Sequence, residues 1–265
     1  MSSSGAADAP DPVRALSFGS VAANYDAYRP AVPASFLSAI GFAPGMRVLE
    51  IAAGTGLATR TLLAGGIEVI AVEPDPDMRR VLTRRSPTLD VRDGVAEHLP
   101  IDDASVDAIL AMSSWHWFDV ERTLSECARV VRDNGRLVAG WNGADQQIDW
   151  VADLFRHREP SGELSPSSDN TPAPSLVTSG HDFRLIKEGR VEWSWHRTVD
   201  DIAGLFGTYS GVITATPETR TSILHTVREI ARRHTNPDGT VTLPMQTRYW
   251  IAQRRPREVT EHASH

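Results

Sequence analysis

The sequence has very little cysteine, no long apolar run and no excess of basic residues. Cys127 is its only cysteine, so an internal disulfide framework is excluded and a secreted, disulfide-stabilised fold is not expected. No stretch approaches the roughly 18 to 20 uninterrupted apolar residues of a membrane-spanning helix. Residues 1–10 have neither the basic nor the apolar region of a signal peptide. These absences predict a cytoplasmic protein without a membrane segment.

The charge balance is acidic. The chain has 27 Lys and Arg residues against 34 Asp and Glu residues, and the resulting net charge of −7 has the wrong sign for binding a phosphate backbone. Nucleic acid is therefore not an expected partner. Hydrophobic residues at 41% and charged residues at 23% are typical of a globular chain. We expect a disordered tail over residues 1–17 and a single domain over residues 18–265.

Strand and helix patterns alternate through residue 141. Apolar runs typical of buried strands occupy residues 46–52, 67–72, 89–93, 106–112 and 136–141. Helical spacing occurs twice within residues 18–43, again over residues 58–63, and after the N-cap residues Asp75 and Asp119; we expect Asn134-Gly135 to end the last of these helices. This alternation predicts an α/β fold with a doubly wound, mostly parallel sheet, whose core spans residues 44–141.

The second half of the chain, residues 142–265, has a less regular pattern. Residues 160–180 are rich in Ser, Pro, Thr and Gly, which predicts a flexible loop. Val191, Trp193 and Trp195 alternate with polar residues as in a strand, and Thr216-Pro217 opens a helical pattern. Residues 244–253 are predicted as a last strand. The order predicts a helical insertion before the final strand of the sheet.

The strongest chemical signal is segment 48–56, in which a buried strand runs into a turn containing Gly54 and Gly56. Glycines in such a turn let a ligand approach the backbone, and the helix that follows presents unpaired N–H groups. With Glu73 at the end of the next strand, the spacing roughly imitates an NAD-binding fingerprint. Two residues oppose NAD, because Thr59 stands at the third glycine position and Glu50 places an acid before the turn. An acid there suits a cationic ligand.

Four ordered blocks resemble the motifs of class I S-adenosylmethionine-dependent methyltransferases, specifically the small-molecule group that includes ubiquinone and menaquinone methyltransferases. The blocks are residues 48–56, 72–75, 93–100 and 105–110, the last followed by an acceptor-side turn over residues 113–118. The sequence departs from the family pattern at Ala52, where glycine is usual, and at Val95, where a polar residue is common. The resemblance implies a seven-stranded sheet with an antiparallel last strand, an N-terminal helical lid over residues 18–43, and S-adenosylmethionine as the cofactor.

The resemblance also implies site residues. Cofactor contacts are expected from Glu50, Ala52, Gly54, Gly56, Glu73, Pro74, Val95, Ala96, Glu97 and Ala111. Among these, Glu73 is expected to bind the ribose hydroxyls, and the backbone near Ala96 is expected to meet the adenine. On the acceptor side, Tyr25 and His116 are the expected catalytic residues, and Tyr28, Arg29 and Trp115 are the expected substrate-binding residues.

The chemistry of methyl transfer limits what the protein must supply. Transfer from a sulfonium is an in-line displacement, so the enzyme mainly provides alignment and a dry pocket, and no metal is expected. His116 is either a general base for an O–H or N–H acceptor or a packed residue that shapes the pocket. We expect a small-molecule acceptor methylated on oxygen, nitrogen or carbon, and a monomer or homodimer. An NAD-dependent oxidoreductase and a non-catalytic S-adenosylmethionine-binding protein stay open as alternatives.

Overall fold

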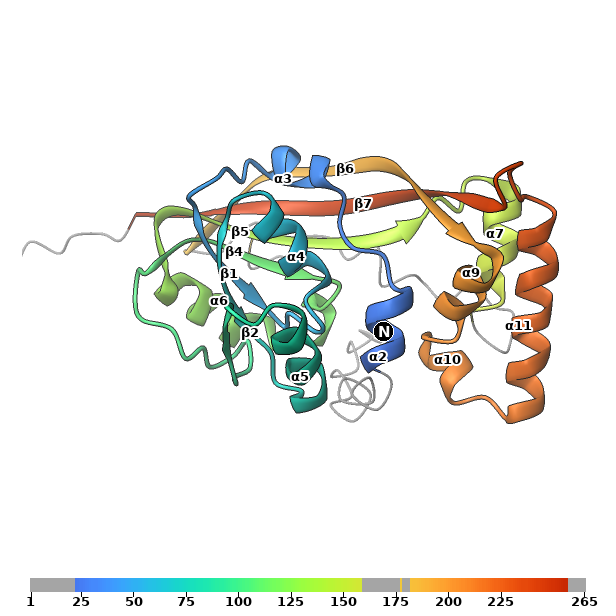
Figure 1. The fold of residues 1–265 in the computed structure, drawn as a ribbon. Coiled ribbons are helices and arrows are strands. Elements are labelled where there is room, and N and C mark those ends of the chain that lie inside the picture. Colours follow the sequence, from blue (N-terminus) through green and yellow to red (C-terminus); the bar gives the residue numbers. More distant parts are fainter. Residues whose placement is uncertain (1–21, 159–176, 178–181, 257–265) are drawn as a thin grey trace, which may run out of the picture.

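The computed structural model describes residues 22–158, 177 and 182–256, which form a seven-stranded sheet in the order β3-β2-β1-β4-β5-β7-β6 (Figure 1). The strands are β1 (Arg47–Ile51), β2 (Glu68–Val72), β3 (Asp90–Arg92), β4 (Val106–Met112), β5 (Val131–Ala144), β6 (Phe183–Thr198) and β7 (Thr240–Arg254). Strands β1 to β5 pair in parallel, and β7 runs antiparallel to both of its neighbours, β5 and β6. The predicted doubly wound α/β sheet with an antiparallel last strand is confirmed.

The helices after Asp75, Asp119 and Thr216 begin where the sequence predicts. They are α2 (Ala22–Tyr28), α3 (Ala34–Ile40), α4 (Leu57–Ala64), α5 (Pro76–Arg85), the 3-10 turn η2 (Trp115–Trp117), α6 (Val120–Val130), α7 (Asp149–Arg156), α9 (Val199–Phe206), α10 (Ser210–Ile213) and α11 (Pro217–Arg232). The Asp75 carboxylate accepts hydrogen bonds from the amides of Asp77 and Met78, and the Thr216 hydroxyl accepts one from the amide of Thr219. Both N-caps are confirmed, because a side-chain acceptor satisfies amides that the helix leaves free.

Helices cover both faces of the sheet. Phe36 of α3 and Leu62 of α4 pack with Val48 and Leu110 on one face, and α5 adds Leu82 against Ala71 on the same side. The opposite face packs against Leu124, Cys127 and Ala128 of α6. Burial raises the pKa of the Cys127 thiol well above its usual range, which agrees with its predicted place in the core.

The helical insertion forms a cap beyond the sheet core. Helices α7, α9, α10 and α11 gather around the far ends of β6 and β7 (Figure 1), where Trp195, Leu243 and Met245 enter an apolar cluster with Phe155 and Phe206. We use the word cap for residues 149–158 and 199–245. Helix α2 lies between this cap and the core helices α4 and α5 (Figure 1).

The structure corrects one boundary. The prediction that Asn134-Gly135 would end the helix is wrong, because α6 ends at Val130 and β5 begins at Val131. Val131 is fully buried and pairs with Val106 of β4, so pairing and burial end the helix four residues early, and Asn134, with φ 64°, lies within β5. The predicted tail and most of the loop 160–180 lie outside the described residues. Within the described part of the chain, no helix is long and apolar enough to cross a membrane.

Candidate active site

A cavity opens at the carboxyl ends of β1, β4 and β5, under α2 and the cap. The space between its walls is about 820 Å³ when it is counted out to the open mouth, solvent included. The core side of its wall comes from Glu50, the turn that follows β1, Ser113 after β4, and Asn142 of β5; the other side comes from Tyr25, Arg29, Phe155, Leu205, Tyr209 and Met245. Ligands of open α/β sheets bind at this edge.

The turn after β1 brings backbone to the cavity. Ala52, Gly54 and Gly56 have φ values of 50°, 59° and 83°. A Cβ added to Gly54 would meet no atom within 4 Å, whereas one added to Gly56 would lie 2.3 Å from Leu82 Cδ1. Ala52 adopts the same left-handed conformation with a side chain, at a cost of about 1–2 kcal/mol. Gly54 therefore leaves room for a ligand against the backbone, and Gly56 packs the turn onto α5.

Glu50 is the one acid among the described residues that line the cavity. It is 2% exposed, and its Oε2 accepts a hydrogen bond of 2.5 Å from the Thr59 hydroxyl of α4. Burial raises the pKa of Glu50 to about 7, while the Thr59 hydrogen bond partly opposes this shift. A cation bound in the cavity would favour the charged form of this carboxyl.

Glu73 lies behind the turn and is not part of the cavity wall. Its Oε2 accepts the Gly54 amide at 2.7 Å and its Oε1 accepts the Asp75 amide at 2.8 Å. Burial raises the pKa of this carboxyl, and the two amides oppose the shift. Glu73 thus fixes the glycine turn to the end of β2. Pro74, the next residue, accepts a hydrogen bond from Arg79 through its carbonyl.

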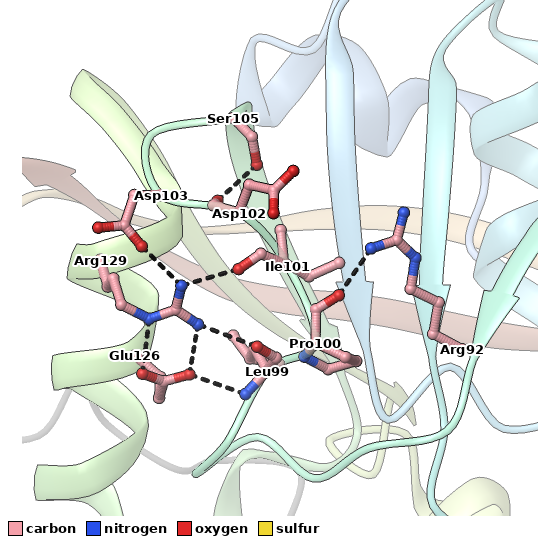
Figure 2. A network of polar contacts seen from close by, with 9 residues as sticks. All are labelled: Arg92, Leu99, Pro100, Ile101, Asp102, Asp103, Ser105, Glu126 and Arg129. Atoms are coloured by element: carbon pink, nitrogen blue, oxygen red, sulfur yellow. Dashed lines mark hydrogen bonds and ion pairs between the residues drawn. The ribbon is translucent and has the colours of Figure 1, made fainter.

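A polar network holds the loop that directly follows residues 95–97, the segment expected at the adenine. Figure 2 shows Arg129 of α6 donating to the carbonyls of Leu99 and Ile101 and to the Glu126 carboxylate, which accepts the Leu99 amide. The Arg129 guanidinium holds the pKa of Glu126 below its usual range. In the segment itself Ala96 is buried, Val95 is exposed, and the Glu97 carboxylate accepts the Asp119 amide at 2.9 Å. None of these three residues reaches the cavity wall.

Helix α2 is bound to the core through Asp26. This buried carboxylate accepts hydrogen bonds from Arg60 Nη2 and Arg85 Nε, each at 2.8 Å, and forms ion pairs with both residues. Arg60 also donates to the Thr55 carbonyl in the turn. The Thr55 hydroxyl is buried on the cavity wall without a hydrogen-bond partner among the described residues. An unpartnered buried hydroxyl in a cavity is suited to contact a polar ligand.

Arg29, the residue directly after α2, connects this segment to the cap. Arg29 Nε donates to the Thr208 hydroxyl at 2.8 Å and Nη2 donates to the Thr208 carbonyl at 3.1 Å. Its guanidinium lies 4.2 Å from the centroid of the Tyr209 ring and 5.3 Å from that of Tyr25. Tyr25 and Arg29 thus lie together on the cavity wall, and the catalytic and substrate-binding roles expected of them stay predictions.

Four other expected residues lie away from the cavity. Trp115 is fully buried behind the sheet, with its ring edge-to-face against Trp250 at 4.8 Å, and His116 lies next to it with its centroid 4.8 Å from that of Trp117. Burial lowers the pKa of His116, and its Nδ1 has no partner among the described residues. Tyr28 packs its ring onto Gly204 of α9, and Ala111 is buried inside β4.

The sequence reasoning missed several lining residues. Ser113 has φ 54° directly after β4, and Asn142 donates to the carbonyls of Pro30 and Ala31 while it accepts from the Thr247 hydroxyl at 2.7 Å. Ser113 directly follows β4, and Asn142 lies near the end of β5, so both are at the sheet edge where the ligand was expected. Their position at this edge could have identified them from the sequence. Phe155 and Tyr209 come from the cap, whose place over the cavity had no local signal.

A glycine turn, an acid before it and a cavity at the carboxyl edge of this sheet define a Rossmann-like small-molecule site. Residues 49–139 match the family described as "Methyltransferase domain". An uncharacterized methyltransferase of Mycobacterium tuberculosis is 36% identical over 219 residues, which cover 83% of this chain and 87% of the relative. The chain belongs to the class I S-adenosylmethionine-dependent methyltransferase family, and it is an enzyme that methylates a small molecule.

Two further likenesses agree with this assignment. A malonyl-[acyl-carrier protein] O-methyltransferase of Methylococcus capsulatus is 36% identical over 190 residues, covering 66% of this chain and 69% of that protein. A solved methyltransferase structure from Anaeromyxobacter dehalogenans matches with a TM-score of 0.65 at 24% identity, covering 86% of this chain and 98% of that one. The structural likeness supports the fold. The NAD-dependent alternative is not retained.

Proposed function

We propose that the glycine turn, Glu50 and Glu73 hold S-adenosylmethionine and that the cavity between α2 and the cap holds the methyl acceptor. The observation that carries this proposal is the turn itself, in which Gly54 leaves open space against the backbone beside the buried Glu50 carboxyl. The donor set fits the cofactor, because the Glu50 carboxyl lines the cavity where a cationic sulfonium would lie and the Thr55 hydroxyl lacks a partner among the described residues. Glu73 keeps a second lone pair on each oxygen for the ribose hydroxyls.

When bound, the cofactor supplies an electrophilic methyl group on a sulfonium. The residues of this chain orient both reactants and exclude water from the space between them. Asn142 fixes Pro30 and Ala31 above the sheet edge, and Tyr25 and Tyr209 close the other side. The described wall contains no His, Lys or Cys, and Glu50 is its one acid.

The proposal also assigns a limited role to His116, which the sequence offered as a general base. His116 lies beside the buried Trp115 and outside the described cavity wall, so the proposal gives it a role in shaping the segment after β4 and none as a base. Ala96 and Glu97 position the adenine end through the loop that Arg129 holds. Ala52, Pro74, Val95 and Ala111 support the cofactor site through backbone conformation and packing.

A pair of glycine variants tests the cofactor site. Gly54 and Gly45 both have positive φ, 59° and 82°, and a Cβ on either meets no atom within 4 Å. Gly54→Ala and Gly45→Ala therefore carry similar backbone strain, but Gly45 precedes β1 at the opposite edge of the sheet. We expect calorimetry to show at least tenfold weaker binding of S-adenosylhomocysteine to Gly54→Ala and unchanged binding to Gly45→Ala. Equal affinities in both variants would contradict the proposed site.

Turnover is tested separately. The protein is incubated with methyl-labelled S-adenosylmethionine and fractions of a metabolite extract, and labelled products are identified by mass spectrometry. We expect label in a small molecule with the wild type and at least tenfold less with Gly54→Ala. Tight cofactor binding without any labelled product in any fraction would contradict the proposal that this cavity holds a small-molecule acceptor.

A further inference from the structure

Arg60 of α4 joins the glycine turn to helix α2. Its Nη1 donates to the Thr55 carbonyl at 3.0 Å, and its Nη2 donates to Asp26 Oδ1 at 2.8 Å. Thr55 belongs to the turn and lines the cavity, whereas Asp26 belongs to α2. One planar guanidinium therefore holds two segments that are far apart in the sequence.

The turn itself fixes the position of Arg60. The Arg60 amide donates to the Gly56 carbonyl at 3.1 Å, in the first turn of α4. The Arg60 side chain is 33% exposed, and the Asp26 side chain that it meets is 3% exposed. Loss of a cation beside a buried carboxylate is costly, because the remaining charge is left without compensation. A shift of the glycine turn therefore moves a cation that Asp26 needs.

Helix α2 contributes one side of the cavity and the turn contributes the other. Tyr25 of α2 and Arg29, directly after it, line the cavity opposite the turn. Figure 1 shows α2 between the cap and the core helices α4 and α5. Because Arg60 contacts both α2 and the turn, it sets the position of one side of the cavity relative to the other.

The charge of Arg60 also acts on Glu50. Burial is the main cause of the raised pKa of Glu50, and the Glu73 carboxylate raises this pKa further, whereas the Thr59 hydrogen bond and the Arg60 cation lower it. Removal of the Arg60 cation therefore shifts the ionisation of Glu50 to higher pH.

Arg85 of α5 is a natural control for Arg60. Its Nε donates to Asp26 Oδ2 at 2.8 Å, the same distance as in the Arg60 pair, and its side chain is 59% exposed. Among the described residues, no hydrogen bond joins Arg85 to the glycine turn. Each arginine thus supplies one ion pair to Asp26, and only Arg60 also holds the turn.

We infer that Arg60 is a positioning residue that couples binding of the cofactor at the glycine turn to the placement of α2 over the cavity. The inference rests on the proposed function, because the turn must be the cofactor site. A cofactor held against the turn restrains Thr55 and Arg60, and Arg60 in turn restrains Asp26. Such coupling is reciprocal, so correct placement of α2 raises the cofactor affinity by the same factor, typically about 5–150-fold.

Hydrogen exchange measured by mass spectrometry tests the coupling. Exchange of the α2 amides is followed with and without saturating S-adenosylhomocysteine in the wild type, Arg60→Met and Arg85→Met. We expect the ligand to slow this exchange at least fivefold in the wild type and in Arg85→Met, and less than twofold in Arg60→Met. Each protein is its own reference, so a general loss of stability does not imitate the result. Equal slowing in the two variants would overturn the inference.

Calorimetry tests the reciprocal effect. We expect Arg60→Met to bind S-adenosylhomocysteine at least fivefold more weakly than the wild type, and Arg85→Met to bind it within twofold of the wild type. Equal losses in both variants would show that only pairing of Asp26 matters, and this result would also overturn the inference.

A conservative variant separates the charge of Arg60 from its bridging geometry. Arg60→Lys keeps a cation near Glu50, but a single ammonium does not reproduce the planar fork that reaches both acceptors. The affinity for S-adenosylmethionine is measured from pH 6 to 8.5, and we expect its rise with pH to shift to higher pH in Arg60→Met and to stay near the wild-type position in Arg60→Lys and Arg85→Met. Arg60→Lys should still lose most of the ligand-dependent protection of α2. Full protection in Arg60→Lys, or one common pH profile in all four proteins, would contradict the role assigned to Arg60.

The same measurements keep the two proposals distinguishable. Failure of S-adenosylhomocysteine to bind the wild type would contradict the proposed function. Normal binding of this compound to the wild type, together with identical behaviour of Arg60→Met and Arg85→Met, would contradict only the coupling assigned to Arg60.

Discussion

Burial of Glu50 gives the protein a measurable dependence of stability on pH. The pKa of Glu50 is raised from 4.5 to about 7 by burial in the folded protein, so the folded state keeps its proton at pH values where the unfolded chain has lost it. The contribution of Glu50 to stability is therefore fully present below about pH 4.5 and is lost as the pH rises through about 7. A shift of this size corresponds to about 3 kcal/mol.

Replacing Glu50 by Gln removes this titration and keeps an acceptor for the Thr59 hydroxyl. Urea unfolding of both proteins from pH 4.5 to 8.5 is expected to show the difference in free energy of unfolding moving by about 3 kcal/mol in favour of Glu50→Gln. Glu68→Gln, at an exposed acid on β2, serves as the matched control and should follow the wild type. Parallel pH profiles for the wild type and Glu50→Gln would refute the reasoning.

The titration of Glu50 also predicts how the affinity for the cofactor depends on pH. A cationic ligand beside Glu50 binds the ionised carboxylate better, so its affinity should rise as the pH increases from 6 to 8. We expect this rise in calorimetry of S-adenosylmethionine with the wild type and its loss in Glu50→Gln. An identical rise in both proteins would assign the pH dependence to another group.

Further substitutions test the glycine turn, the proposed ribose contact of Glu73, the anchoring of α2 and the role of His116. Glu73→Gln should weaken S-adenosylhomocysteine binding at least tenfold in calorimetry, since charged hydrogen bonds contribute about 1.5–3 kcal/mol each; unchanged affinity would remove Glu73 from the ribose site. Gly56→Ala should lower the free energy of unfolding in urea by about 2 kcal/mol or more, because φ is 83° and the new Cβ meets Leu82; a loss no larger than that of Gly45→Ala would contradict the packing argument. Asp26→Asn should speed amide exchange of α2 at least tenfold with little change in α11, and equal protection would show that its ion pairs do not hold the helix. His116→Ala should keep cofactor affinity and lose less than tenfold in turnover, whereas a hundredfold loss would restore its role as a base.

Local chemistry explains what the sequence could predict. Asp75 and Thr216 satisfy free amides at helix starts, so their positions mark boundaries without knowledge of the fold. The carboxyl ends of neighbouring parallel strands meet at one edge, which is why Glu50 and Glu73 were expected together and lie on either side of the same turn. The roles expected of these acids stay predictions until ligand binding is measured.

Contacts between segments far apart in the sequence set the orientation of several site residues, and local sequence patterns do not predict such contacts. Both sides of α2 are covered, one by the core and the other by the cap, so helical spacing could not show that Tyr25 faces the cavity while Tyr28 packs on Gly204. Packing of Trp115 against Trp250 of β7 sets the direction of the turn that carries His116. Tyr209 reaches the cavity from a cap whose location depends on the whole length of β6 and β7.

The two long antiparallel strands β6 and β7 run from the cap into the sheet core, and their pairing shifts register once, between Leu185 and Lys187. In β7, Val241 and Leu243 belong to the apolar cluster of the cap, and Trp250 and Ala252 belong to that of the core. β6 pairs with β7 from Thr198 to Phe183 across both regions. Because both strands continue through this junction, paired backbone fixes where the cap lies relative to the core. Changes of substrate range are therefore expected from side chains on the cavity wall more readily than from exchange of the whole cap.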